Sequence, residues 1–224
     1  MVLLNKCLVL LFNLKMEVKD KKKHILKSAE KLFAVKGFEA STVRDIADDA
    51  GVNLAMISYY FGSKEKMMES LFQERMNNTK LKVQQILSNE HISTFGKVEV
   101  MLDEYIKKVI ENESFYKILL CEQVMKKNPE IIRMLRELKM DYAAMFTELV
   151  KEGQKKKVFK KNIDVVLALN TMTGTVTQII INKEHYCEFN NIEILQEEEL
   201  KNFLHSKLFD HLKNIFKTIL GYES

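Results

Sequence analysis

Apolar residues recur every three or four positions through most of the chain, which is the spacing of one face of an α-helix. The first such stripe lies within residues 19–35, and Gly37 follows it, as glycine commonly does after a helix. Two shorter stripes cover residues 42–50 and 53–59, each followed by a glycine. We expect Ser41 or Thr42 to cap the first of these helices and Asn53 to cap the second. The pattern therefore predicts three helices, two of them short, at the N-terminal end of the chain.

Longer stripes follow these three helices. A fourth helix is expected from about Lys64 to Leu87, after a cap at Ser63. Five further helices are expected over residues 96–111, 115–127, 130–151, 163–182 and 198–220. The segment 183–191 is polar and is predicted to interrupt the last two. Nine helices and no strand give an all-α fold class.

The first fifteen residues are apolar but are interrupted by Asn5, Lys6 and Asn13. They are too short and too polar to cross a bilayer, and they lack the basic start and small-residue cleavage site of a signal peptide. We expect Met16 to be the natural start, with residues 1–15 a non-native or disordered extension. A genuine N-terminal extension that packs against the protein is the alternative.

Composition adds few constraints. The chain is 46% hydrophobic and 29% charged, a soluble globular profile, and its net charge of +4 permits nucleic-acid binding without arguing for it. The cysteines Cys7, Cys121 and Cys187 are far apart and form no C-x-x-C pair. This pattern indicates a reduced, cytoplasmic protein with no disulfide framework and no structural zinc site.

Residues 42–66 combine two short helices with a glycine-containing turn, which is the signature of a helix-turn-helix. The second helix is too short to be stable alone, so apolar neighbours must hold it. Those neighbours are Ile46, Ala47, Val52, Ile57 and Phe61. Its opposite face is small or polar, at Asn53, Ala55, Ser58 and Tyr59. Such a face can approach the edges of bases in a major groove.

Residues 23–71 also resemble the DNA-binding domain of the tetracycline-repressor (TetR) family. The resemblance is carried by the runs Leu32-Phe33-Ala34, Lys36-Gly37-Phe38, Ser41-Thr42-Val43-Arg44-Asp45-Ile46-Ala47, Ala50-Gly51-Val52 and Ile57-Ser58-Tyr59-Tyr60-Phe61-Gly62-Ser63-Lys64-Glu65. It covers about a fifth of the chain. The remainder shares with that family only its length, its helix count and its lack of a sequence pattern.

The resemblance implies a DNA-binding transcriptional regulator and assigns roles to matching positions. We expect the DNA-binding residues to be Thr42, Arg44, Asn53, Leu54, Ala55, Met56, Ser58, Tyr59, Tyr60 and Lys64, with Lys21, Lys22 and Lys23 beside them. Thr42 would cap the second helix and touch a phosphate, and Tyr60 and Lys64 would contact phosphates of the DNA backbone. Leu54 and Met56 are apolar, so contact with thymine methyl groups or readout of DNA shape is expected to carry more of the specificity.

The rest of the chain is expected to bind an effector and to dimerise. This gives a helix-turn-helix domain over residues 16–62 and a larger domain over residues 63–224, with the helix over 63–87 as connector. For the effector pocket we expect Phe115, Leu119, Glu122, Gln123, Tyr142 and Met145, holding an apolar small molecule. For the homodimer interface we expect Leu169, Met172, Val176, Ile180, Phe203, Leu204, Leu208 and Leu212.

The expected function is a repressor that an effector releases from a pseudo-palindromic operator in double-stranded DNA. No paired carboxylates, nucleophile elbow, phosphate loop or metal-ligand spacing is visible, so we expect no enzyme activity, cofactor, metal or membrane partner. The alternative is a helical-bundle enzyme or a small-molecule carrier, in which the first three helices only pack.

Overall fold

The computed structural model describes residues 20–192 and 196–223, and of residues 77–81 the backbone alone. The expectation for residues 1–15 lies outside these ranges. The described part of the chain is mostly α-helical and contains no strand. The fold class predicted from the sequence is therefore confirmed.

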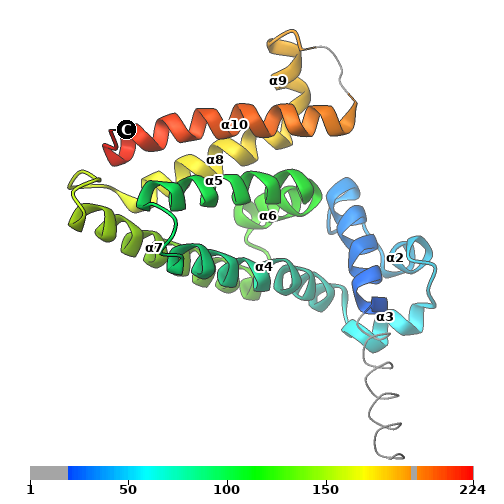
Figure 1. The fold of residues 1–224 in the computed structure, drawn as a ribbon. Helices are drawn as coiled ribbons and strands as arrows, with labels where there is room; N and C mark the ends of the chain where they lie inside the picture. The colour runs from blue at the N-terminus through cyan, green and yellow to red at the C-terminus, as the bar shows by residue number, and fades with distance from the viewer. Residues whose placement is uncertain (1–19, 193–195, 224) are drawn as a thin grey trace, which may run out of the picture.

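Three short helices and the start of a long one form one end of the molecule (Figure 1). A first helix covers residues 20–36, followed by α2 (Val43–Asp49) and α3 (Leu54–Phe61). The fourth, α4 (Lys64–Ser88), runs from this end into the rest of the molecule. Apolar side chains from all four helices are buried here, among them Ile25, Phe33, Ile46, Ile57 and Met67.

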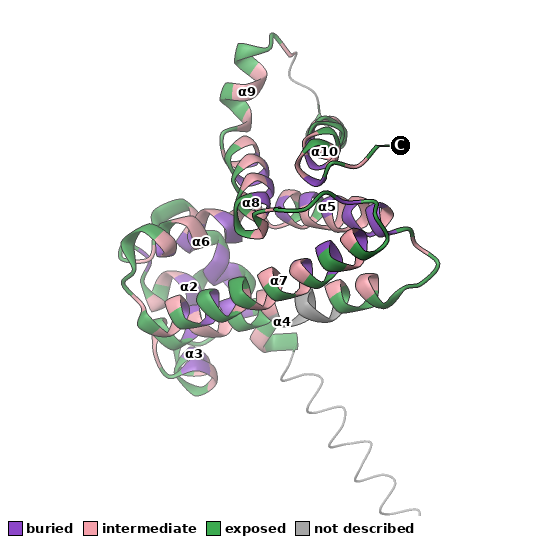
Figure 2. Cartoon of the chain, turned by 90° about the vertical axis from the view of Figure 1, so that its left-hand side faces the viewer, coloured by how far each residue is buried: buried purple, intermediate pink, exposed green. Residues whose placement is uncertain are grey.

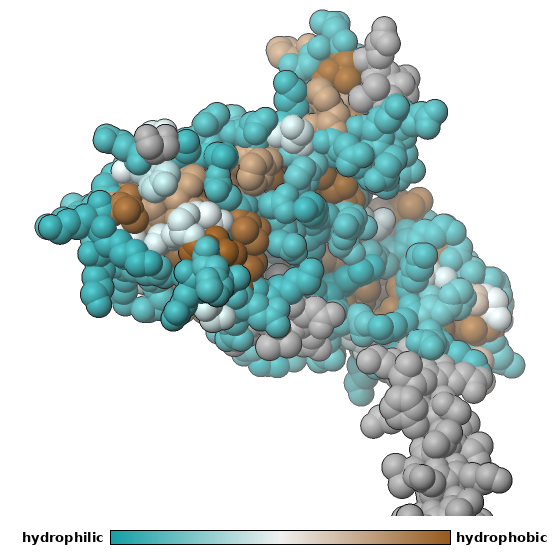
Figure 3. Space-filling model, viewed as in Figure 1, coloured by the Kyte–Doolittle hydropathy of each residue, from teal (hydrophilic) through white to brown (hydrophobic). Residues whose placement is uncertain are grey.

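The remaining helices form a larger body, in which α4 lies along α7 and α10 lies along α5. Their bounds are α5 Thr94–Glu111, α6 Glu113–Met125, α7 Pro129–Lys155, α8 Val165–Ile181, α9 Lys183–Phe189 and α10 Glu197–Leu220. Most of the molecular surface seen in Figure 3 is hydrophilic, and apolar residues reach it in separate patches. The apolar stripes predicted from the sequence therefore lie mostly between the helices.

One helix was not predicted. The polar segment that was expected to be a loop contains α9, seven residues long with no buried residue. Figure 2 shows this helix standing away from the other helices. Because α9 buries no residue and packs Tyr186 alone against the core, its sequence carries no apolar stripe from which a helix could be predicted.

The predicted dimer interface lies largely inside the protomer. Six of its eight residues are buried by the chain's own helices: Met172, Val176, Ile180, Leu204, Leu208 and Leu212. Leu169 and Phe203 are half-buried. An apolar stripe reports that a residue is covered, and it does not report whether the same chain or a partner covers it. An interface on α8 and α10 would therefore rest mostly on other residues of these helices, and the predicted interface stays a prediction.

No single described helix is long and apolar enough to cross a membrane. Only α8 and α9 taken as a pair reach that length and composition, and they are bent by 81°.

Candidate nucleic-acid interface

The start of α2 is fixed by a reciprocal pair of hydrogen bonds. The Thr42 hydroxyl oxygen accepts from the backbone N–H of Asp45 at 3.1 Å, and the Asp45 carboxylate accepts from the backbone N–H of Thr42 at 3.0 Å. The hydrogen bond from the Thr42 backbone N–H is the main cause that holds the pKa of the Asp45 carboxyl below its usual value. The sequence left the cap open between Ser41 and Thr42. The structure selects Thr42, while Ser41 is buried and its hydroxyl donates to the carbonyl of Gly37.

The next helix, α3, begins with the predicted cap at Asn53, whose side-chain oxygen accepts from the backbone N–H of Ala55 at 2.9 Å. Ile57 and Phe61 point into the small core and are 2% and 5% exposed. Gly62 ends the helix at a φ of +77°, a conformation that favours glycine. A helix of only eight residues is thus held by a cap at one end and two buried side chains.

The other face of α3 is open to solvent. Leu54, Ala55, Ser58 and Tyr59 are all exposed, and Tyr59 is 80% exposed, with its ring edge-on to Tyr60. Met56 and Tyr60 are half-buried at the sides of this face. An aromatic ring so exposed contributes little to the stability of the fold. The structure therefore presents together most of the residues that were expected to read DNA.

Lys64 has protein partners that the sequence did not reveal. Its Nζ donates to the carbonyl oxygens of Phe38 at 2.8 Å and Ser41 at 3.1 Å, and it lies 4.3 Å from the centre of the Phe38 ring. The first residue of α4 thus ties this helix to the turn that precedes α2. The predicted phosphate contact of Lys64 stays a prediction, and the structure adds a positioning role.

Basic residues flank the exposed face of α3. Arg44 on α2 is exposed, as are Lys21 and Lys23 on the first helix. Lys22 is half-buried, with its Nζ 5.4 Å from the centre of the Phe61 ring at the end of α3. The first turn of the first helix therefore lies beside the end of α3, close enough for its charges to meet DNA that α3 approaches.

A charged cluster connects this end to the body. The guanidinium of Arg75 on α4 donates to Glu30 of the first helix at 2.9 and 2.6 Å, and to the side-chain oxygen of Asn112 at 2.6 Å. Asn112 stands between α5 and α6, and the Glu30 side chain is only 7% exposed. Sequence reasoning missed these three residues, because they are 37 and 45 positions apart and no local pattern links them.

A second connection joins the turn between α6 and α7 to the same end. Lys127 pairs with Glu39 at 2.8 Å, next to the turn that Lys64 holds. Asn128 donates to Glu69 of α4 at 3.2 Å. The helix-turn-helix is thus fastened to the body through both α4 and the α6–α7 turn.

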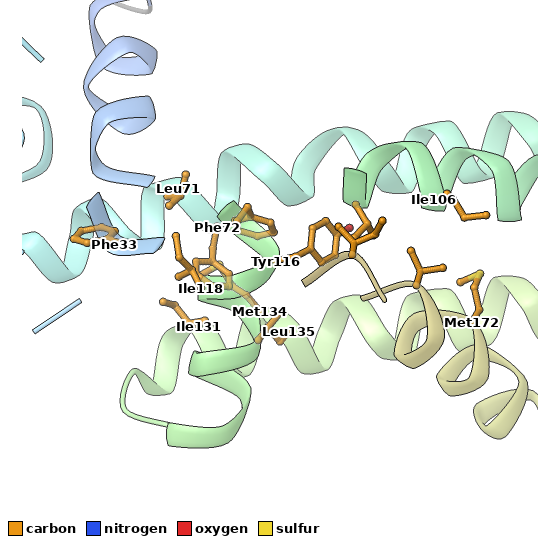
Figure 4. Close-up of a cluster of buried hydrophobic side chains, with 14 of the residues drawn as sticks. Phe33, Leu71, Phe72, Ile106, Tyr116, Ile118, Ile131, Met134, Leu135 and Met172 are labelled. Carbon is orange, nitrogen blue, oxygen red and sulfur yellow. The ribbon is translucent and has the colours of Figure 1, made fainter. Parts of the chain in front are cut away.

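One of the predicted effector-pocket residues, Phe115, belongs to the buried core. Phe115 is buried against Phe72, with ring centres 5.0 Å apart. Figure 4 shows Phe72 in a continuous apolar cluster with Tyr116, Ile118, Ile131 and Met134.

The other predicted pocket residues differ in position. Leu119, Tyr142 and Met145 are half-buried, and Gln123 accepts a hydrogen bond at 2.6 Å from Lys139 at the surface. Glu122 is 7% exposed and burial raises the pKa of its carboxyl. Burial and hydrogen bonding thus differ among the predicted residues, and the effector pocket they were expected to form stays a prediction.

Comparison with known proteins gives consistent results. Residues 25–71 match the sequence profile described as bacterial regulatory proteins, tetR family. The HTH-type transcriptional repressor KstR2 of Rhodococcus jostii is 26% identical over 151 residues, which cover 67% of this chain and 74% of that protein.

Two solved structures share the arrangement of helices. The fatty acid degradation regulator FadR from Bacillus halodurans is 25% identical with a TM-score of 0.62, covering 84% of this chain and 94% of that one. The regulator FadR from Bacillus subtilis, solved in complex with stearoyl-CoA, is 21% identical with a TM-score of 0.62, covering 85% and 96%.

Proposed function

This chain is a DNA-binding transcriptional regulator of the tetR family, and on that premise we propose that it is a homodimeric repressor that a small molecule releases from its operator. We assign DNA binding to residues 16–62, and effector binding and dimerisation to residues 63–224, with α4 as the connector. We place its action in the cytoplasm, where the DNA is.

The observation that best supports the proposed DNA binding is the solvent-exposed face of α3. Ala55 and Ser58 are small enough for the helix backbone to approach the floor of a major groove, which is about 12 Å wide. Tyr59 stands beside them, 80% exposed, where it would reach a base edge or a phosphate. Leu54, 41% exposed, offers an apolar contact for the methyl group of thymine.

The dimer is proposed to form on the exposed sides of α8 and α10. Val166 and Leu167 on α8 are apolar and 58% and 64% exposed. Gly174 lies two helical turns further along the same side, and a β-carbon added there would meet nothing within 4 Å. A partner helix could therefore approach closely. Two-fold symmetry would then present two α3 helices to successive major grooves about 34–36 Å apart, which requires a pseudo-palindromic operator.

The effector is proposed to be a small, largely apolar molecule bound in the body. The stearoyl-CoA complex of the Bacillus subtilis regulator supports this class of ligand for a protein with the same arrangement of helices. The dimer would have one form that fits the operator and one that does not. To release DNA, the ligand must bind more tightly to the form that does not fit. The Arg75 cluster is the contact through which a shift of the body would reach the first helix.

The test is selection of DNA from genomic fragments by the purified full-length chain, followed by affinity measurement across a salt series. We expect a pseudo-palindrome bound by a dimer. Tyr59→Ala is expected to weaken that binding about tenfold, the effect of losing one good contact to a base. Phe189→Ala is the matched control, because Phe189 is an aromatic residue that is 79% exposed on α9. Weak binding that is indifferent to sequence and disappears with salt would refute the proposal.

A further inference from the structure

A cleft of about 230 Å³ lies where α5 ends, α6 and α10 begin, and α8 leads into α9. None of the residues expected to form the effector pocket lines it. Four aliphatic side chains line it instead: Ile110, Ile180, Leu200 and Leu204. Ile180 and Leu204 are each 2% exposed, so the inner part of the cleft is apolar.

The remaining lining residues are two lysines and two glutamates. Lys183 pairs with Glu113 at 2.5 Å, and Lys201 pairs with Glu197 at 2.7 Å. An apolar interior with charges at its edge fits an amphiphile, a molecule with an aliphatic chain and one charged group.

The partners of the two lysines indicate the sign of that charge. Glu113 also pairs with Lys117 at 2.7 Å, so it keeps a cation if Lys183 turns toward a ligand. The side chain of Glu197 is 82% exposed, and an ion pair so exposed contributes little to stability. Both ammonium groups can therefore exchange their glutamate partners for the anionic group of a ligand. A cationic ligand at Glu113, the less exposed of the two glutamates, would instead have to displace both Lys117 and Lys183.

We propose that this cleft binds a small anionic amphiphile, with its chain on the four aliphatic residues and its carboxylate or phosphate between Lys183 and Lys201. The volume is below the roughly 300–1,000 Å³ of sites for drug-sized ligands, which favours a short chain. The proposal of a binding site rests only on the lining residues and their ion pairs. Its regulatory role rests on the proposed function.

The position of Glu113 suggests how a ligand bound in the cleft would affect the contacts of the first helix. Asn112 directly precedes Glu113 and accepts the hydrogen bond from Arg75, whose guanidinium also holds Glu30 of the first helix. A ligand that draws Lys183 from Glu113 changes the contacts of the α5–α6 junction. Asn112 lies at that junction and belongs to the cluster that connects the DNA-binding end to the body.

Three eight-carbon probes test the charge preference: octanoate, octanol and octylamine. Their binding to the full-length chain is measured by calorimetry without DNA. We expect octanoate to bind most tightly and octylamine least tightly. Equal affinities for octanoate and octylamine, or no detectable octanoate binding, would overturn the proposal.

Two variants test the location. Replacing both Lys183 and Lys201 with glutamine should weaken octanoate at least about tenfold, because two charge-assisted contacts are lost. Lys151→Gln is the matched control, since Lys151 also sits in an exposed helical ion pair, with Glu148 at 2.8 Å. Leu200→Trp fills the cleft without removing a charge and should also abolish binding. Octanoate binding that survives both changes would place the ligand elsewhere.

Operator binding with and without octanoate separates this inference from the proposed function. Octanoate bound in the cleft of a protein that selects no DNA sequence would support the site and refute the repressor. Sequence-specific DNA binding by a protein that does not bind octanoate would support the regulator and refute the site. Operator release by octanoate that the two glutamines abolish would support both.

Discussion

The DNA-binding end, which comprises the first helix, α2, α3 and the start of α4, and the helical body, which comprises the remaining helices, stabilise their helices by different means. At the DNA-binding end, α2 and α3 have seven and eight residues, and each depends on a side-chain cap at its start. In the body, α5, α7 and α10 have 18, 27 and 24 residues and bury long apolar stripes against one another. A short helix is marginal in water, so its ends decide its stability, whereas a long amphipathic helix is stabilised by packing.

This difference leaves the face of α3 free for another purpose. Because two inward side chains and one cap hold that helix, its outward residues contribute little to the fold. In the body, by contrast, the apolar residues of the long stripes are buried between helices, so they are not available to contact a partner. The two regions still share one continuous apolar core, which runs from Phe33 in the first helix to Ile106 and Met172 in the body (Figure 4).

The largest effect is expected from a change in the core of the body. Phe146 on α7 is 2% exposed and lies edge-on to Phe216 of α10. Phe146→Ala should lower the free energy of unfolding by about 3–5 kcal/mol, through lost burial and the cavity that remains. Urea denaturation measures it. Met140→Ala on the same helix is the control, since Met140 is 67% exposed and its loss should change stability by less than about 0.5 kcal/mol.

A smaller effect is expected where the two regions meet. Arg75→Ala leaves the Glu30 carboxylate, 7% exposed, without its cation. Breaking a buried pair costs about 3–5 kcal/mol, and because the Arg75 side chain is 33% exposed we expect roughly 2–3 kcal/mol here. Hydrogen exchange should show the first helix losing more protection than α7, because the connection between the regions is weakened.

Two further variants make the Arg75 result specific. Replacing both Arg75 and Glu30 with glutamine should recover part of the loss, because no unpaired charge is then buried. Arg133→Ala removes an arginine that is 56% exposed and pairs with Glu130 and Glu137 on α7, and it should lower stability far less than Arg75→Ala does. Equal losses for Arg75→Ala and Arg133→Ala would mean that the cluster does not join the regions.

The same contrast explains how much of the structure could be predicted from the sequence. The caps at Asn53 and Ser63 were predicted, and Thr42 was one of two expected residues, because a cap and the backbone it serves are only two or three positions apart. The Arg75 cluster and the cleft depend on how distant helices meet, and no local pattern contains that information. Leu208 and Leu212 show the same limit, since their stripe predicted their burial but could not tell whether the same chain or a partner covers them.

A third effect appears at acid pH and belongs to the body. Glu152 on α7 accepts hydrogen bonds from Lys156 at 2.5 Å, Lys97 at 3.1 Å and Thr94 at 3.1 Å. The bond from Lys156, with those from Lys97 and Thr94, lowers the pKa of Glu152 from 4.5 to about 2. Because the folded state holds the proton less tightly than the unfolded chain, this stabilisation is complete above pH 4.5 and is lost as the pH falls toward about 2.

Glu152→Gln should therefore flatten the dependence of stability on pH between about 4.5 and 2. At neutral pH it should cost roughly 1–2 kcal/mol, an estimate reduced for the partial exposure of the carboxylate. Thermal unfolding at a series of pH values measures both. Glu148→Gln is the control, because that carboxylate is 71% exposed and pairs only with Lys151 in the described structure. An unchanged pH dependence in Glu152→Gln would show that other carboxylates dominate.

The smallest effect tests the comparison most directly, because it makes the same chemical change in both regions. Thr42→Ala and Ser93→Ala each remove a hydroxyl that caps a helix, α2 in the DNA-binding end and α5 in the body. Loss of a cap costs about 0.5–2 kcal/mol. We expect Thr42→Ala near the upper end, since α2 buries only Ile46 and Ala47, and Ser93→Ala near the lower end, since α5 buries seven residues. Urea denaturation of both variants, with Thr42→Ser as the substitution that keeps the cap, measures the difference. Equal losses would mean that packing, and not the cap, also determines the stability of the short helices.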